Sequence, residues 1–121
     1  MRLILQGVPP SLNRFAGREN VWEYREQKRY WSTMVLVAVL SCDDRPKSPY
    51  AKARVEIRYF FQRAGRHDAD NYCGKLLLDG LTRAGVIADD DFAHISLAVS
   101  GAVDRDRPRT EITITPEEAE K

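Results

Sequence analysis

The sequence predicts a single α+β domain in which one four-stranded mixed sheet is covered on one side by two helices, with the element order β-α-β-α-β-β. The chain has 121 residues, the length of one ordinary domain, and 43% of them are hydrophobic, which is enough for a core without disulfides or structural metal. Segments of alternating polarity are interrupted by two segments whose apolar residues recur at helical spacing. Because a sheet and two helices pack most simply as two layers, residues 1–121 are expected to form one unit.

The first half of the chain predicts a strand, a long helix and a second strand. Residues 2–7, RLILQG, have the composition of a strand, and Pro9 and Pro10 end it and begin a loop. Residues 21–40 predict a helix whose second half is apolar and therefore buried. Residues 52–61, KARVEIRYFF, alternate between an apolar face and a mainly basic face, which is the pattern of a half-buried strand.

The second half of the chain predicts one more helix followed by two strands. Residues 70–84 predict a helix that Gly85 stops. Residues 94–103, HISLAVSGAV, and residues 109–116, RTEITITP, have strand composition and are joined by the turn-like DRDRP. Two helices and four strands complete the predicted order.

Charge is distributed unevenly along the chain, although the net charge is only +1. Residues 66–91 hold six Asp against three Lys or Arg, a net charge of −3, and the remainder holds 16 Lys or Arg against 12 Asp or Glu, a net charge of +4. An acidic segment in basic surroundings suits a protein that holds a cation at a site facing an anionic partner. Ordinary mixed surface charge gives the same composition.

Nothing in the sequence indicates a membrane or secreted protein. The apolar run at residues 34–40 is too short to span a bilayer, and the first residues lack the apolar stretch of a signal peptide. Cys42 and Cys73 have no metal-ligand spacing, and we expect reduced thiols rather than a disulfide. We therefore expect a cytoplasmic protein without a membrane partner.

Acidic residues gather on both sides of the predicted second helix. Asp68 and Asp70 lie where the chain has left a strand, and on an extended segment residues two apart share a face. Asp89 and Asp90 follow Gly85, and if the chain turns back along the helix, three or four carboxylates converge and need a cation to offset their repulsion. Oxygen ligands without a nearby histidine or cysteine favour Mg²⁺, with Mn²⁺ as a substitute.

Simpler interpretations of these acids are open at this point. Asp70 is also a good N-cap for the following helix, and residues 89–91 can form a solvated turn. A calcium loop of the EF-hand type fits poorly, because Tyr72 stands where an oxygen ligand is needed and Cys73 stands where that loop requires glycine.

The complete string of motifs is more specific than any acidic pair. D-x-D-N, a lysine, L-x-x-D-G-L and A-G-V-I-x-D-D follow one another over residues 66–95, with PPSLNR and RTEITIT on the two sides. This string resembles the RusA family of Holliday-junction resolvases. The resemblance implies four catalytic residues, of which the three Asp bind the metal: Asp68, Asp70, Asp90 and Lys75. It makes Asp89, the neighbour in the Asp pair, a further candidate ligand.

The sequence departs from the family pattern in one place. The family usually has two residues between the Asn and the Lys, whereas three residues, ending in Gly74, separate Asn71 from Lys75 here. In a regular helix one extra residue rotates Lys75 by about 100° relative to Asp70, unless the first turn bulges. Lys75 then either faces the carboxylates or pairs with Asp79 on the helix surface.

The function implied by the resemblance is a Mg²⁺-dependent endonuclease that resolves Holliday junctions and other branched DNA by phosphodiester hydrolysis, in DNA recombination and repair. A four-way junction offers two symmetric strands to cut, which suits a homodimer. The basic residues expected to grip the DNA backbone are Arg14, Lys52, Arg54, Arg58, Arg63 and Arg66. Two alternatives stay open: a non-catalytic DNA-binding module, which the extra Gly74 favours, and a metal-dependent nuclease that acts on flaps or RNA.

Overall fold

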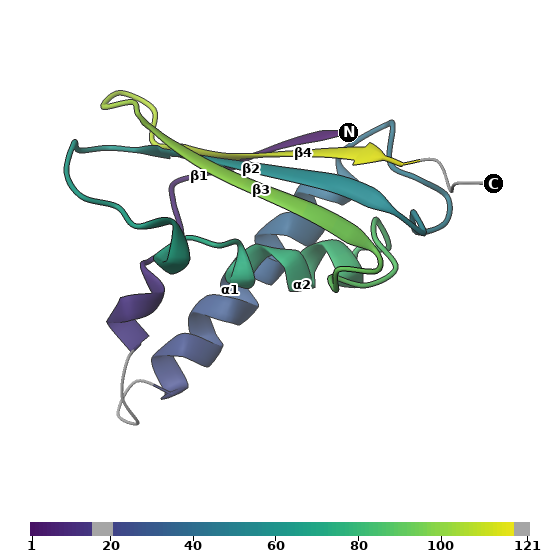
Figure 1. The fold of residues 1–121 in the computed structure, drawn as a ribbon, viewed down its shortest axis with the longest axis horizontal. Coiled ribbons are helices and arrows are strands. Elements are labelled where there is room, and N and C mark those ends of the chain that lie inside the picture. Colours follow the sequence, from purple (N-terminus) through teal and green to yellow (C-terminus); the bar gives the residue numbers. More distant parts are fainter. Residues whose placement is uncertain (16–20, 118–121) are drawn as a thin grey trace.

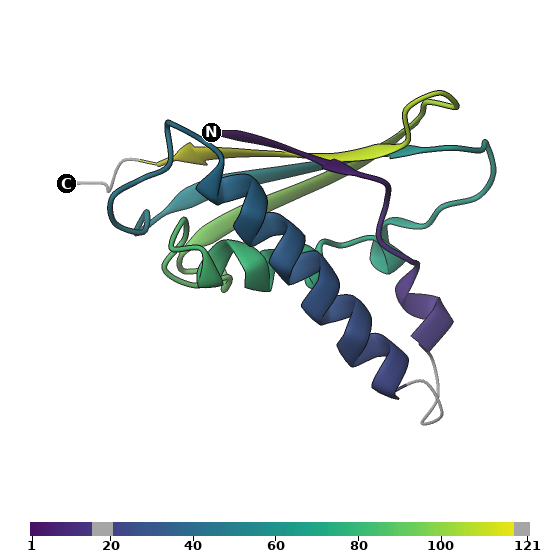
Figure 2. The same ribbon diagram turned by 180° about the vertical axis from the view of Figure 1, so that it is seen from behind.

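A four-stranded sheet and two helices form two layers in the computed structural model, which describes residues 1–15 and 21–117 (Figure 1). The predicted α+β class and the order of helices and strands are confirmed, and the described residues add two short 3-10 helices. In chain order the elements are β1 (Arg2–Gln6), η1 (Leu12–Phe15), α1 (Val21–Leu40), β2 (Ala53–Phe61), η3 (Ala69–Asn71), α2 (Lys75–Arg83), β3 (Ile95–Val103) and β4 (Arg109–Pro116). Both α-helices lie on the same side of the sheet, as the view from behind also shows (Figure 2).

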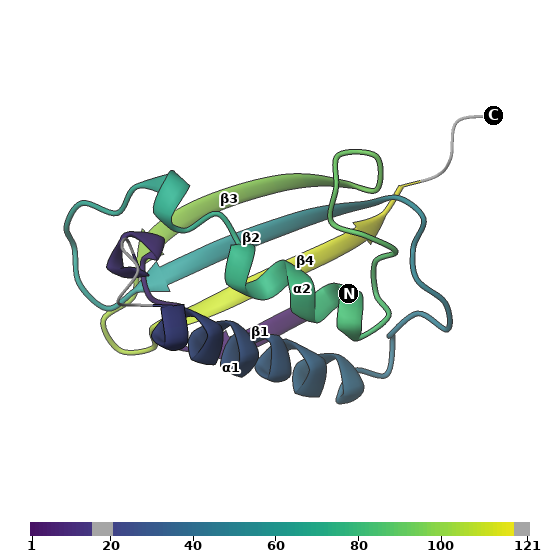
Figure 3. The same ribbon diagram turned by 90° about the horizontal axis from the view of Figure 1, so that it is seen from below.

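The strand order β1-β4-β2-β3 makes β1 and β3 the two edges of the sheet. β4 runs antiparallel to both of its neighbours, whereas β2 and β3 are parallel. The register places Ala53 beside Ile95 and Phe61 beside Val103. Because β2 and β3 point the same way, the segment between them, which contains η3 and α2, travels back along the sheet before β3 begins (Figure 3).

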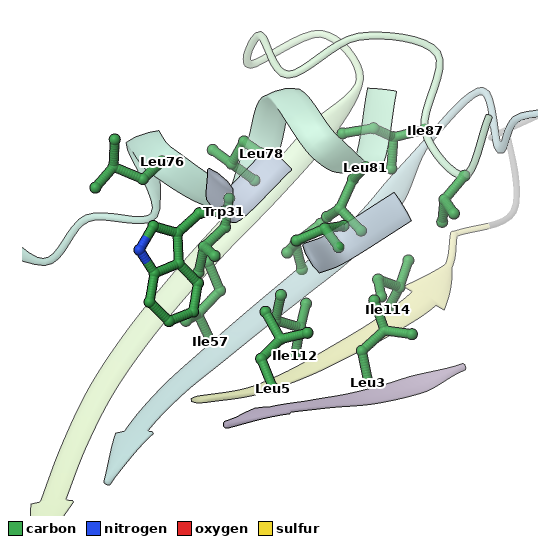
Figure 4. Packing of buried hydrophobic residues seen from close by; sticks show 14 of the residues in the cluster. Leu3, Leu5, Trp31, Ile57, Leu76, Leu78, Leu81, Ile87, Ile112 and Ile114 are labelled. Carbon is green, nitrogen blue, oxygen red and sulfur yellow. The ribbon is translucent and has the colours of Figure 1, made fainter. Parts of the chain in front are cut away.

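The core lies between the sheet and the helices, and the alternation seen in the sequence builds it. The even-numbered residues of β2 from Arg54 to Arg58 are exposed, and the odd-numbered residues from Ala53 to Phe61 are buried. The helices contribute the buried apolar side chains of Trp31, Val35, Val39, Leu76, Leu77, Leu78 and Leu81 (Figure 4). Each fully buried side chain of this size contributes about 1.5–3 kcal/mol to folding.

Gly80 allows α2 to lie very close to α1. A Cβ atom at this position would lie 2.7 Å from the Val35 Cβ and 2.9 Å from the Ser32 carbonyl oxygen, so no larger residue fits without moving a helix. Next to this contact, Arg83 Nη1 donates a hydrogen bond of 2.7 Å to Ser32 Oγ. These contacts fix the position of α2, and therefore of the segments that enter and leave it.

The prediction that one helix extends from residue 70 to residue 84 is wrong at its start. Asp70 lies in the 3-10 turn η3, and α2 begins only at Lys75, with Gly74 as its N-cap. Gly74 has a φ of 86°, which a residue with a side chain rarely adopts, and a Cβ atom there would lie 2.6 Å from Ile57 Cδ1. The left-handed glycine interrupts the helix, so Asp70 is not the N-cap of α2.

The remaining sequence predictions concern membranes and thiols. Within residues 1–15 and 21–117, no helix has the combination of length and apolar composition needed to cross a bilayer. Cys42 and Cys73 are both free and half-buried. The Cys42 thiol donates to the carbonyl of Ala38 at 3.3 Å, one turn earlier at the end of α1.

Candidate functional site

The first acidic segment lies where the chain leaves β2 and turns back over the sheet. The His67 ring stacks on Phe61, with ring centroids 3.7 Å apart and planes 1° from parallel. Tyr72 meets Phe61 edge-on at 4.9 Å and Tyr59 at 5.7 Å. These rings anchor both ends of the segment that carries Asp68 and Asp70, and so hold the two carboxylates near the exit of β2.

A pocket opens beside Asp68 at this end of the sheet. It is lined by Tyr59, Phe61, His67, Asp68, Ala69, Tyr72, Val99, Ser100 and Gly101. Arg66 Nε donates a hydrogen bond of 3.0 Å to Asp68 Oδ1 across an exposed surface. Asp70 is exposed, and within the described part of the chain its carboxylate has no hydrogen bond or ion pair. Both carboxylates can therefore be reached from solvent by a cation.

Tyr59 forms the floor of this pocket and cannot act as a base there. Its side chain is buried, and burial raises the pKa of its phenol well above the ordinary value, with a further rise from the nearby Cys73 thiol. The phenol therefore stays protonated at neutral pH, and its contribution to the pocket is apolar surface.

The second acidic segment lies just before β3. One carboxylate oxygen each from Asp89 and Asp91 and a ring nitrogen of His94 lie within 4.8 Å of one another, a spacing that could hold a metal ion. The hydrogen bond with His94 Nδ1 lowers the pKa of the Asp91 carboxyl below its ordinary value, and the backbone N–H groups of Ala93 and His94 act in the same direction. Asp90 lies between these residues and is exposed, but it is not part of this group.

The expectation that both acidic segments converge within one chain is wrong. The His94 carbonyl accepts a hydrogen bond from Ala53 N–H, at the start of β2, whereas His67 stacks on Phe61 at its end. Eight residue steps of a strand separate these points, roughly 25 Å. The chain does not turn back after Gly85, because residues 86–88 bond to Tyr50 instead. The two segments therefore lie at opposite ends of the sheet, both along its β3 side (Figure 3).

Lys75 follows neither of the two arrangements considered for it. Its amine lies 5.7 Å from the centre of the Tyr24 ring on α1, in a cation–π contact. It makes no ion pair with Asp79 within the described residues. The interruption at Gly74 turns the first residue of α2 toward α1 and the η1 segment, and Lys75 shares a small pocket with Leu12 and Asn71.

The predicted DNA-contacting bases fall into two groups. Arg63 and Arg66 are exposed beside the first acidic segment. Arg54 and Arg58 point away from the helices, and there Arg54 pairs with Glu56 at 2.8 Å while Arg58 lies 5.1 Å from the Phe60 ring centre. Arg14 of η1 forms an ion pair with Glu23, and Lys52 is exposed just before β2.

Sequence reasoning missed two members of the second acidic segment, Asp91 and His94. The signal was present, because an Asp followed three residues later by His brings both side chains together in a single turn. The preference for a site without histidine therefore does not hold at this end of the sheet. His67 was missed as well, and its stacking on Phe61 depends on a tertiary contact.

The fold and these segments define a small α+β protein with exposed, paired carboxylates of the kind that bind divalent cations. Residues 7–115 match the family model described as endodeoxyribonuclease RusA. The chain therefore belongs to the RusA family of endodeoxyribonucleases. A comparison with curated proteins gives no match.

Proposed function

We propose that this chain is a metal-dependent endonuclease that resolves Holliday junctions and related branched DNA during recombination and repair. The family match, which spans nearly the whole chain, carries this proposal. The Asp68-x-Asp70-Asn71 segment supports it, because the rings at the exit of β2 hold both carboxylates at an exposed position. A DNA strand can therefore approach them.

Asp68 and Asp70 are the residues that would hold the metal ion at one end of the sheet, and Asp90 with Asp89 would provide ligands from the other. The donor set fits the ion, because exposed carboxylate oxygens suit Mg²⁺ and Mn²⁺. His94, next to Asp91, would favour Mn²⁺ if it took part, because a nitrogen ligand suits a transition metal. When bound, the ion polarises the scissile phosphate and lowers the pKa of a bound water.

The basic residues near the first acidic segment would position the DNA. Arg63 and Arg66 can neutralise phosphates beside the scissile one, and such contacts give affinity with little sequence preference. The exposed amine of Lys75, which only a cation–π contact with Tyr24 holds, can turn toward a phosphate and offset charge on the leaving oxygen. Arg14, Lys52, Arg54 and Arg58 are candidates for contacts farther along the junction arms.

The site requires two chains, because one chain keeps its acidic segments roughly 25 Å apart. In a two-fold dimer, Asp68 and Asp70 of one chain can meet Asp89 and Asp90 of the other, and two equivalent sites result. The two sites would face the two symmetric strands of a four-way junction. A homodimer is therefore proposed as the active form.

Mixing two inactive variants tests the shared site. Asp70→Asn and Asp90→Asn are each expected to be inactive, but a mixed dimer has one site in which both residues are intact. Chains that are unfolded together and refolded should therefore regain about a quarter of the wild-type sites if subunits combine at random. The measurement is nicking of a labelled four-way junction. No recovery, with mixed dimers demonstrated by mass spectrometry, would show that each site belongs to a single chain.

A substrate panel tests the function itself. With Mg²⁺, the protein should cut a four-way junction faster than a flap, a linear duplex or RNA of the same sequence, and EDTA should stop the reaction. Binding to the junction without cutting under any metal condition would instead support a non-catalytic DNA-binding module. Faster cutting of flaps or RNA would support a nuclease with a different substrate.

A further inference from the structure

We infer that two copies of this chain pair through the free edge of β3 and that each inserts Phe92 into the pocket beside Asp68 of its partner. This inference rests on the proposed function for its consequence, since it says how the two halves of the metal site meet. The interface itself is supported by the edge strand, the exposed ring and the pocket.

The β3 edge has the properties of a strand that another strand covers. Its nine residues, ISLAVSGAV, include no charge and no proline, and most of them are exposed. In the described part of the chain, β2 is its only strand neighbour. Soluble proteins protect free edges with charges, prolines, bulges or short strands. The opposite edge, β1, is protected in this way, because it has five residues and carries Arg2.

Phe92 is an apolar ring with no place in its own chain. It lies in the turn just before β3 and is fully exposed, in contrast to the buried Ile95 three residues later. Exposed apolar surface at such a position marks a contact with another molecule. Its neighbours are Asp91 and Ala93, so whatever buries this ring also places the second acidic segment.

The pocket beside Asp68 is the matching surface. Its walls are the rings of Phe61, His67 and Tyr72, and its other side is the β3 backbone at residues 99–101. Gly101 leaves the pocket open toward the strand, because a Cβ atom there would approach Phe61 Cε2 to 3.1 Å. An aromatic ring fits such walls by stacking or edge contact.

Antiparallel pairing of the two β3 edges satisfies all these features at once. A two-fold axis perpendicular to the sheet, near the middle of β3, keeps the helices of both chains on one face. The end of β3 that holds the pocket then lies beside the partner's start of β3, which carries Phe92 (Figure 3). The same pairing brings Asp68 and Asp70 toward the partner's residues 89–91, and it joins two sheets into one of eight strands.

The oligomeric state of four variants tests this interface independently of catalysis. Leu97, 41% exposed on β3, and Ile4, 53% exposed on β1, are matched apolar positions on opposite edges. Leu97→Lys should turn the dimer into a monomer, measured by sedimentation velocity on the full chain, whereas Ile4→Lys should leave it dimeric. Phe92→Ser should raise the dimer dissociation constant at least about tenfold, since it removes two buried rings per dimer. Trp22→Ser, at another exposed aromatic residue, should leave that constant unchanged.

The outcomes separate the interface from the proposed function. Phe92→Ser changes a residue that is fully exposed in the chain, so a lost dimer with an unchanged far-ultraviolet circular dichroism spectrum supports the interface even if Leu97→Lys misfolds. A dimer that survives Leu97→Lys and Phe92→Ser, or that Ile4→Lys disrupts, would overturn the inference and leave the nuclease assignment standing. A dimer with the predicted sensitivity but no nuclease activity would support the interface and contradict the function.

Discussion

Asp70→Asn is expected to lower the rate of four-way junction cleavage by more than about 100-fold, which is the upper end of the loss when even an indirect partner of a metal ion is removed. The Asp70 carboxylate makes no contact with the described part of the protein, so its loss should leave the fold unchanged. Asn has nearly the same shape, but its neutral amide binds divalent cations far more weakly than a carboxylate does. Junction binding should be retained or tighten, because one negative charge facing the phosphates is removed.

The measurements for Asp70→Asn are single-turnover cleavage with Mg²⁺, junction binding with Ca²⁺ or EDTA, and thermal unfolding. Asp43→Asn is the matched control, because Asp43 is also an exposed carboxylate and lies in the loop after α1, away from both acidic segments. It should cut at the wild-type rate. Wild-type cleavage by Asp70→Asn would remove this residue from the metal site.

The periodic parts of the fold could be predicted from sequence because their patterns are local. The 20 residues of α1 have the predicted bounds, Val21–Leu40, and β4 likewise matches its prediction at Arg109–Pro116. The start of α2 could not be predicted in the same way. Residues 70–74 have acceptable helix composition, and what excludes them from the helix is the approach of the Gly74 backbone to Ile57, a residue on another element.

The candidate site divides along the same line. The carboxylates belong to motifs of fixed spacing, so their identity could be predicted from sequence. Their distance could not, because it depends on the parallel pairing of β2 with β3, which separates the residues next to Phe61 from those next to Ala53. Convergence was therefore expected in the wrong place: within one chain rather than between two. The uncharged β3 edge was visible in the sequence, but only the strand order shows that it is an edge.

Gly74→Ala is expected to lower the free energy of unfolding by about 2–5 kcal/mol, since strain and overpacking act together. A left-handed conformation costs a residue with a side chain on the order of 1–3 kcal/mol. The new Cβ would lie 2.6 Å from Ile57 Cδ1 in a packed core, and overpacking of this kind costs about 1–3 kcal/mol more. Urea unfolding followed by tryptophan fluorescence measures the change.

Two further variants separate the two causes. Gly85 also has a left-handed φ, 76°, but nothing lies within 4 Å of a Cβ built there, so Gly85→Ala should show the conformational cost alone. Ile57→Val removes the Cδ1 atom that the new methyl group would meet. By itself it should cost about 0.5–1.5 kcal/mol, but combined with Gly74→Ala it should recover part of the loss, because the two side chains compete for the same space. Strict additivity of the two changes would show that Gly74 is required only for its backbone conformation. A coupling of about 1 kcal/mol or more would show that the close approach to Ile57 also requires glycine, and hence that the core of the sheet determines where α2 begins.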